Sequence, residues 1–156
     1  METAYIKTPL GVAKIVGDEK GISIISILEE SEVTDKIPSV LQEAVTQLND
    51  YFEGNRNAFD FKINPSGTEF QQKVWQELLN IPFGKTMSYL DLSKRLGDIK
   101  AIRAVASANG KNPLWIVVPC HRVIGTDGSL TGYAGGLWRK KWLLEHESPN
   151  AQQSLF

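Results

Sequence analysis

The only cysteine of the chain, Cys120, ends a short apolar run and is followed at once by a histidine and an arginine. The run reads Ile116-Val117-Val118-Pro119, and His121 and Arg122 come directly after the thiol. A structural cysteine usually has apolar neighbours, whereas an imidazole and a guanidinium favour the thiolate, which is the nucleophilic form. These residue types predict a cysteine enzyme whose nucleophile ends a short active-site strand.

A thiol of this kind needs a base, because an unperturbed cysteine has a pKa of about 8.5. His121 is the candidate, but neighbours on a strand point to opposite faces, so contact requires a bend or a bridging water. Arg122 either acts on the local field or ties down a loop. A third group usually fixes the tautomer of a catalytic imidazole. We select Glu147, since a carboxylate at a helix C-terminus breaks a local electrostatic rule, with a solvated glutamate as the alternative. His146 fits a favourable helix C-terminal cation better than a catalyst.

Length and composition limit the class of protein. A chain of 156 residues with 42% hydrophobic side chains forms one domain or two small ones. One cysteine excludes an internal disulfide and a thiolate zinc site, so we expect no metal. The N-terminus lacks the pattern of a signal peptide, and no apolar stretch reaches the roughly 18 residues of a membrane helix. We therefore expect a cytoplasmic protein that does not enter a membrane.

Charge is unevenly divided along the chain. Residues 1–70 carry six Lys/Arg and twelve Asp/Glu, whereas residues 71–141 carry eleven and four, although the net charge is only −1. A basic half beside an acidic half suggests that the basic half binds nucleic acid, with two ordinary solvated surfaces as the alternative.

The first half alternates β-rich runs with turn residues and then changes to a helical period. The pattern predicts an antiparallel sheet with strands near residues 5–7, 12–16 and 22–27. A helix is expected from about Ser39 to Phe52. Asn55 to Gly67 are expected to form a strand and then a linker.

The second half is predicted to be mainly helical. Thr68-Glu69-Phe70-Gln71 is a capping-box pattern, Ser88 caps a second helix that ends at Gly97, and a third helix covers residues 100–110. The last two helices make a plausible helix-turn-helix motif. Small and basic residues interleave on the third helix, which favours contact with nucleic acid over tight core packing. A final helix is expected at about residues 137–147, after a glycine-rich loop.

These elements predict an α+β protein. An N-terminal domain, residues 1–66, has a small antiparallel sheet with a helix. A mostly helical C-terminal domain, residues 67–147, contains the helix-turn-helix and the Pro-Cys-His-Arg strand. Residues 148–156 are expected to be a flexible tail.

The stretch Pro119-Cys120-His121-Arg122-Val123 resembles the active-site motif of the O6-alkylguanine-DNA alkyltransferases, the suicide DNA-repair methyltransferases. The similarity covers about residues 67–147 with fitting spacing, and Tyr51-Phe52-Glu53-Gly54 matches loosely before it. Other matching segments are Ile81-Pro82-Phe83-Gly84, Ser88-Tyr89, Arg103-Ala104-Val105, Asn112-Pro113, Gly135-Gly136-Leu137 and Lys141-Trp142-Leu143-Leu144.

The resemblance implies an enzyme without a cofactor that moves an alkyl group from O6-alkylguanine in DNA irreversibly onto its own Cys120. O4-alkylthymine is a second candidate substrate. His121, oriented by Glu147, takes the thiol proton through a water, and Asn112 holds the region around the nucleophile. Tyr89 donates toward the leaving guanine. The base pocket is formed by Val123, Tyr133, Ala134 and Gly135; many family members have serine where this chain has Ala134.

The implied partner is double-stranded DNA with an alkylated base, and the target nucleotide must be flipped out of the helix. In the family the second helix of the helix-turn-helix enters the minor groove, and an arginine, matched by Arg103, replaces the extruded base. The minor groove encodes little sequence, which suits a repair protein. We expect a monomer whose DNA contacts come from Ser88, Tyr89, Ala101, Arg103 and Ala104.

Three other functions stay open. A non-enzymatic sensor would bind alkylated DNA and leave the alkyl group in place, but relatives of that kind carry tryptophan instead of the cysteine. A helix-turn-helix transcription regulator would not explain residues 119–123. A turnover Cys-His hydrolase would need an oxyanion hole, which the sequence does not signal.

The last five residues suggest a second partner. Gln152-Gln153-Ser154-Leu155-Phe156 resembles the Gln-x-Ser-Leu-Phe type of peptide that docks bacterial sliding clamps. A terminal Leu-Phe has little use in a core and provides an apolar anchor. A disordered tail without a partner is the alternative.

Overall fold

The computed structural model describes residues 1–130, 133 and 135–148 of the chain. These residues form two compact units. The first unit comprises Met1–Ser66 and Pro113–Val117, and the second comprises Gly67–Asn112 and the described residues from Val118 onward. The chain therefore leaves the second unit at Pro113 and re-enters it at Val118, two residues before the cysteine.

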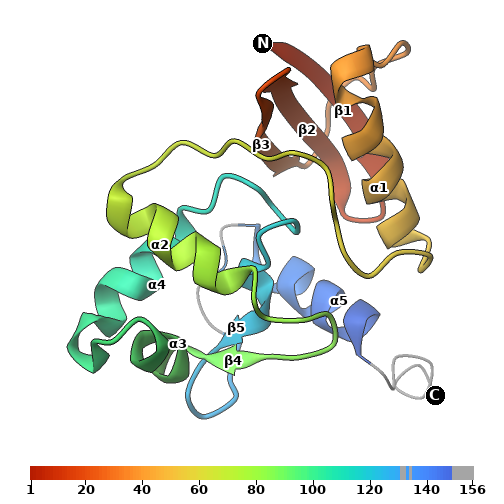
Figure 1. The fold of residues 1–156 in the computed structure, drawn as a ribbon. Coiled ribbons are helices and arrows are strands. Elements are labelled where there is room, and N and C mark those ends of the chain that lie inside the picture. The colour runs from red at the N-terminus through yellow and green to blue at the C-terminus, as the bar shows by residue number, and fades with distance from the viewer. Residues whose placement is uncertain (131–132, 134, 149–156) are drawn as a thin grey trace, which may run out of the picture. The chain divides into compact units, whose positions relative to one another are not determined.

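The first unit is built on a three-stranded antiparallel sheet. Its strands β1 (Glu2–Thr8), β2 (Gly11–Asp18) and β3 (Gly21–Leu28) lie in chain order, as Figure 1 shows. Buried and less buried residues alternate along them, as expected of a sheet with a covered face. A 3-10 turn, Ser39–Leu41, leads into α1 (Gln42–Phe52), which buries Val45, Leu48 and Tyr51. The predicted strands and helix are confirmed.

The strand expected within residues 55–67 is wrong for the described chain. Only Ile63 pairs with the sheet, through an isolated bridge to Ile22. Earlier in this segment the backbone N–H of Asp60 donates to the Gln47 side chain at 3.1 Å, and Pro65 has no N–H to extend a ladder. Side-chain bonds and a proline thus replace strand pairing here.

The active-site strand expected before the cysteine is also wrong. The backbone of Ile25 in β3 accepts from Trp115 at 3.0 Å and donates to Pro113 at 2.8 Å, but pairing stops there. Ile116 has a φ of 71°, a strained conformation for a β-branched residue. Tight turns follow, with Val117 N–H bonded to Trp115 O and Cys120 N–H bonded to Val118 O. Apolar character in this run reflects burial, not a strand.

The second unit begins with three helices. They are α2 (Glu69–Leu78), α3 (Tyr89–Arg95) and α4 (Ile102–Gly110), and a 3-10 turn, Ile99–Ala101, precedes α4. The predicted capping box is present, because Thr68 and Gln71 exchange side-chain to backbone hydrogen bonds. Helix α4 packs against both α2 and α3, and the Trp75 indole donates to Ala108 O at 2.9 Å. The helix-turn-helix pair α3–α4 is therefore fixed to α2.

Two short strands and one helix complete this unit. β4 (Met87–Ser88) pairs in parallel with β5 (Val123–Ile124), and a 3-10 turn, Cys120–Arg122, runs directly into β5. The last helix is α5 (Leu137–Glu147), and Gly136 at its N-terminal cap has a φ of 93° that suits glycine. The β4–β5 pair holds the start of α3 beside the chain that follows the cysteine.

The predicted α+β fold is confirmed. Within the described ranges, the helices are all too short or too polar to cross a bilayer.

Candidate active site

Cys120 is the first residue of the 3-10 turn that follows Pro119. Its side chain is buried, with 8% exposure, and it is a free thiol. Because the turn replaces a strand, the side chains of Cys120 and His121 do not simply point to opposite faces. No direct hydrogen bond between them is present among the described contacts.

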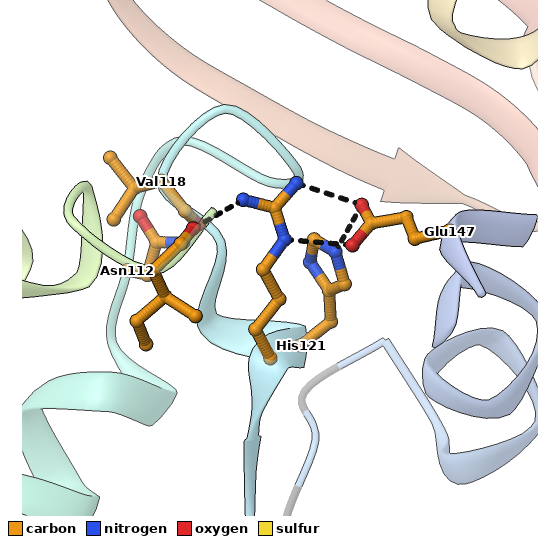
Figure 2. Close-up of polar contacts among 6 residues, drawn as sticks. Asn112, Val118, His121 and Glu147 are labelled. Carbon is orange, nitrogen blue, oxygen red and sulfur yellow. Dashed lines mark hydrogen bonds and ion pairs between the residues drawn. The ribbon is translucent and has the colours of Figure 1, made fainter. Parts of the chain in front are cut away.

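His121 and Glu147, which sequence reasoning paired, meet in the interior. The His121 Nε2 lies 2.7 Å from Glu147 Oε2, and both side chains are almost fully buried. Figure 2 shows the Glu147 carboxylate reaching from the end of α5 to the His121 ring. The alternative of a solvated glutamate is excluded, since the exposure of Glu147 is 2%.

Arg122 fixes this pair from the other side. Its Nε donates to Glu147 Oε1 at 2.7 Å, and one terminal nitrogen donates to Oε2 at 3.0 Å. The other terminal nitrogen donates to the carbonyl of Ile81, at 2.7 Å, in the turn after α2. Of its two predicted roles, the geometry shows the second: Arg122 ties the loop after α2 to the active-site turn through the Ile81 carbonyl, and its two-point bond holds the Glu147 carboxylate.

Burial and hydrogen bonding determine the charges of the pair. Burial alone would raise the pKa of Glu147, but hydrogen bonds and charge from His121 and Arg122 outweigh it and bring the value to about 2. Burial lowers the pKa of His121 in spite of its bond to Glu147. A neutral His121 donates Nε2–H to the carboxylate, which leaves the buried Nδ1 as the acceptor. The geometry therefore presents a base at Nδ1.

The thiol is surrounded by groups with opposing effects. Burial raises the pKa of Cys120, while Asn112, Lys140 and Tyr133 act to lower it. Asn112 also donates to the carbonyl of Val118 at 2.7 Å and so braces the turn before the cysteine. The structure brings Asn112 to the nucleophile, as expected.

Lys140 is a residue that sequence reasoning missed. It lies fully buried on α5, and its Nζ is 5.9 Å from the Tyr89 ring centre and 6.0 Å from that of Tyr133. Burial lowers the pKa of Lys140, and the charge of Cys120 opposes this effect. The available signal was its spacing from Glu147, because two residues two turns apart share one helix face.

The predicted pocket residues Val123, Tyr133 and Gly135 belong to the second unit. Val123 is fully buried beside Met87 in the β4–β5 pair, and Tyr133 is half-buried. The carbonyl of Gly135 accepts a hydrogen bond from the buried Arg139 at 2.7 Å, which sequence reasoning also missed. Ala134 lies outside the described residues.

The predicted DNA-contact residues lie on the helix-turn-helix. Ser88 accepts from Asp91 N–H at 3.0 Å and so caps α3, as expected. Arg103 and Ala104 are exposed on α4, and Ala101 is half-buried at its start. Tyr89 is half-buried, and the Asn109 amide donates to its hydroxyl at 3.4 Å. His146 stacks on the Trp142 ring, with ring centres 4.9 Å apart.

Comparison with known proteins agrees with this geometry. The model of the 6-O-methylguanine DNA methyltransferase DNA-binding domain matches residues 69–149, and that of the ribonuclease-like domain of the same family matches residues 1–65. The chain belongs to the 6-O-methylguanine DNA methyltransferase family. The resemblance seen in the sequence is thus confirmed.

Relatives within this methyltransferase family match over nearly their whole length. The methylated-DNA–protein-cysteine methyltransferase of Methanosarcina acetivorans is 44% identical, over 94% of this chain and 98% of that protein. The protein of the same name from Mycobacterium tuberculosis H37Rv is 43% identical, over 96% and 94%. The crystal structure of Mycobacterium tuberculosis OGT in complex with DNA has a TM-score of 0.86 and 41% identity, with all of both chains covered.

Replacing Glu147 with Gln should make the free energy of unfolding depend less steeply on pH in the acid range. The pKa of this carboxyl is about 2 when folded and 4.5 in its ordinary state, so its contribution is present above pH 4.5 and lost as pH falls toward 2. The pKa shift corresponds to about 3 kcal/mol of the free energy of unfolding. Urea unfolding at a series of acidic pH values should show a shallower slope for Glu147→Gln. Glu145→Gln, exposed on the same helix, is the control and should follow the wild type; equal slopes in all three would contradict the assignment.

Proposed function

We propose that the protein repairs DNA by transferring the alkyl group of O6-alkylguanine to the Cys120 sulfur. The observation that carries this proposal is a single buried thiol directly before a buried His121–Glu147 pair, in a chain of the methyltransferase family. Each molecule reacts once, because the thioether that forms has no route back to a thiol within this site.

The reaction is a single displacement at the alkyl carbon. The sulfur–carbon bond forms as the bond between that carbon and guanine O6 breaks. His121 Nδ1 takes the thiol proton, through a water, as general base. The Glu147 carboxylate, held by Arg122, orients the ring and stabilises the imidazolium that develops. Tyr89 donates a hydrogen bond to the leaving guanine, whose departure is easier as its negative charge is reduced.

Residues 67–147 carry DNA binding and alkyl acceptance in this proposal. The exposed Arg103 and Ala104 lie on α4, where small side chains allow close approach to the sugar–phosphate walls of the minor groove. Arg103 takes the place of the flipped base, and Val123, Tyr133, Ala134 and Gly135 receive that base. The DNA complex of the Mycobacterium tuberculosis relative supports DNA as the partner.

Three finer proposals rest on the sequence. The protein acts as a monomer. It acts in the cytoplasm. Residues 152–156, outside the described part of the chain, dock a sliding clamp.

Incubation with an oligonucleotide containing O6-methylguanine should add one methyl group per protein molecule. Intact-protein and peptide mass spectrometry should place that methyl on the Cys120 peptide, with saturation at one equivalent. Cys120→Ser, which keeps the side chain's shape, should bind the same DNA without gaining mass. An unmodified wild type that still binds the lesion would make the protein a sensor and would end the proposal of transfer.

Replacing Arg103 with Ala should slow methyl transfer from duplex DNA by about tenfold or more, because the arginine compensates part of the few kcal/mol that unstacking a base costs. The substitution should slow methyl transfer from the same lesion in single-stranded DNA much less. Single-turnover rates on both substrates test this. Arg95→Ala, another exposed arginine of the helix-turn-helix, is the control and should affect the two substrates alike. Equal losses on both substrates for Arg103→Ala would argue against a role in base flipping.

Deleting residues 152–156 should abolish binding to a bacterial sliding clamp and leave methyl transfer from a short oligonucleotide intact. A pull-down with purified clamp measures the first property, and mass spectrometry measures the second. Unchanged recovery of the clamp by the shortened protein would remove the docking proposal.

A further inference from the structure

Arg122 and His121 share the carboxylate of Glu147. The Arg122 Nε donates to Oε1 at 2.7 Å, and a terminal nitrogen donates to Oε2 at 3.0 Å. The His121 Nε2 lies 2.7 Å from the same Oε2. Both oxygens are therefore bonded to the guanidinium, and one of them also contacts the imidazole. This arrangement allows Arg122 to act on the local field at His121, the first of its two predicted roles.

The three side chains lie in the interior, where charge must be balanced. Their exposed fractions are 0% for His121, 8% for Arg122 and 1% for Glu147. A guanidinium stays protonated in proteins, whereas an imidazole gains or loses its proton near neutral pH. Arg122 is thus the permanent cation of this cluster, and His121 is the member whose charge can change.

The guanidinium decides which charge of the ring is favoured. A carboxylate at 2.7 Å from an imidazole favours the imidazolium, because the two then form an ion pair. With Arg122 bonded to the same carboxylate, a proton on His121 would place a second cation beside one anion. Like charges repel strongly in a buried site, where water does not screen them. The contacts of Arg122 therefore favour the neutral ring.

The other groups around His121 act in known directions. Burial has the largest effect on the pKa of His121 and lowers it, the hydrogen bond and charge of Glu147 raise it, and the charges of Arg122 and Lys140 lower it. These groups lie on α5 and on the turn Cys120–Arg122, which pack against each other. Burial keeps the neighbouring Cys120 thiol neutral. Of these groups, Glu147 favours the imidazolium, and Arg122 is bonded directly to it.

We propose that Arg122 keeps His121 uncharged in the resting protein, because its guanidinium neutralises the Glu147 carboxylate to which both side chains are bonded. The purpose of this device rests on the proposed alkyl transfer: only a neutral ring has a free Nδ1 to accept the proton of the Cys120 thiol. Arg122 gives up no proton and acts on the ring through Glu147, so it is a positioning residue. The bonds made and broken are those of the displacement already described.

Titration of the histidine rings by NMR tests the charge directly. The chain has two histidines, so protein with 13C-labelled histidine gives one ring Cε1 signal from His121 and one from His146. In the wild type the His121 ring should be neutral at pH 7. In Arg122→Met the midpoint of its titration should rise by about one pH unit or more, which is a tenfold change in the ratio of charged to neutral ring.

Two matched variants separate the charge of Arg122 from its bulk. Arg122→Lys keeps the charge and should keep the His121 ring neutral at pH 7. Arg139→Met removes an arginine that is equally buried but bonded to the carbonyl of Gly135, and it should leave the His121 titration unchanged. If Arg122→Met does not fold, Arg122→Gln, which keeps N–H donors without a charge, should raise the midpoint in the same way.

The pH dependence of methyl transfer tests the consequence for the reaction. At pH 7, single-turnover transfer from O6-methylguanine DNA should be about tenfold slower in Arg122→Met than in the wild type, because most rings already carry a proton. The difference should shrink as the pH rises, and the midpoint of this recovery should coincide with the His121 midpoint measured by NMR. A merely structural loss would slow transfer by the same factor at every pH.

Four results would overturn the proposal. They are a charged His121 ring at pH 7 in the wild type, a ring that stays neutral when Arg122 is replaced by Met or Gln, an Arg122→Lys variant that titrates like Arg122→Met, and a rate difference that does not change with pH. A wild type that gains no methyl from DNA would instead refute the proposed function, and the NMR titration would still decide the charge of the ring.

Discussion

A buried carboxylate at the end of α5 is the constraint on which the rest of the site depends. Glu147 receives two hydrogen bonds from Arg122 and one from His121. Removing a charge from water is costly, and only close, well-directed partners compensate for it. The carboxylate therefore requires Arg122 and His121 to adopt one arrangement, which in turn fixes the turn that carries Cys120 and, through Ile81, the loop after α2.

The same arrangement favours a neutral nucleophile and a neutral base in the resting site. Burial favours the neutral thiol of Cys120 and the neutral ring of His121, while Glu147 stays ionised against Arg122. Charge separates only when the proton leaves the sulfur, and the preorganised carboxylate stabilises the imidazolium at that moment. A neutral thiol reacts slowly with other electrophiles, and it becomes nucleophilic when its proton moves to His121.

Local signals predicted much of the fold and part of the site. The Thr68 capping box and the Ser88 cap were predictable because they depend on residues three positions apart, and the sheet followed from alternation along the chain. The contact between His121 and Glu147 was predictable from residue types and helix position. The roles assigned to the site residues stay predictions.

Long-range packing was not predictable. A lysine normally reaches solvent, so its spacing from Glu147 alone was too weak a signal to predict that Lys140 is fully buried. A short apolar run has the same sequence pattern in a strand and in a buried turn, and residues 116–118 were therefore wrongly predicted to form a strand. Asn109 was overlooked because its partner, Tyr89, lies on a different helix.

The return of Pro113–Val117 to the first unit has a consequence for synthesis. Ile25 lies early in the chain, yet its backbone partners are Pro113 and Trp115. Domains usually fold as units while the ribosome is still extending the chain, the N-terminal one first. Here the sheet cannot complete its contacts until most of the polypeptide has emerged, and the alkyl acceptor needs the last helix as well. Both halves of the molecule therefore mature together, late in translation, and a stalled nascent chain carries neither a finished scaffold nor a working nucleophile.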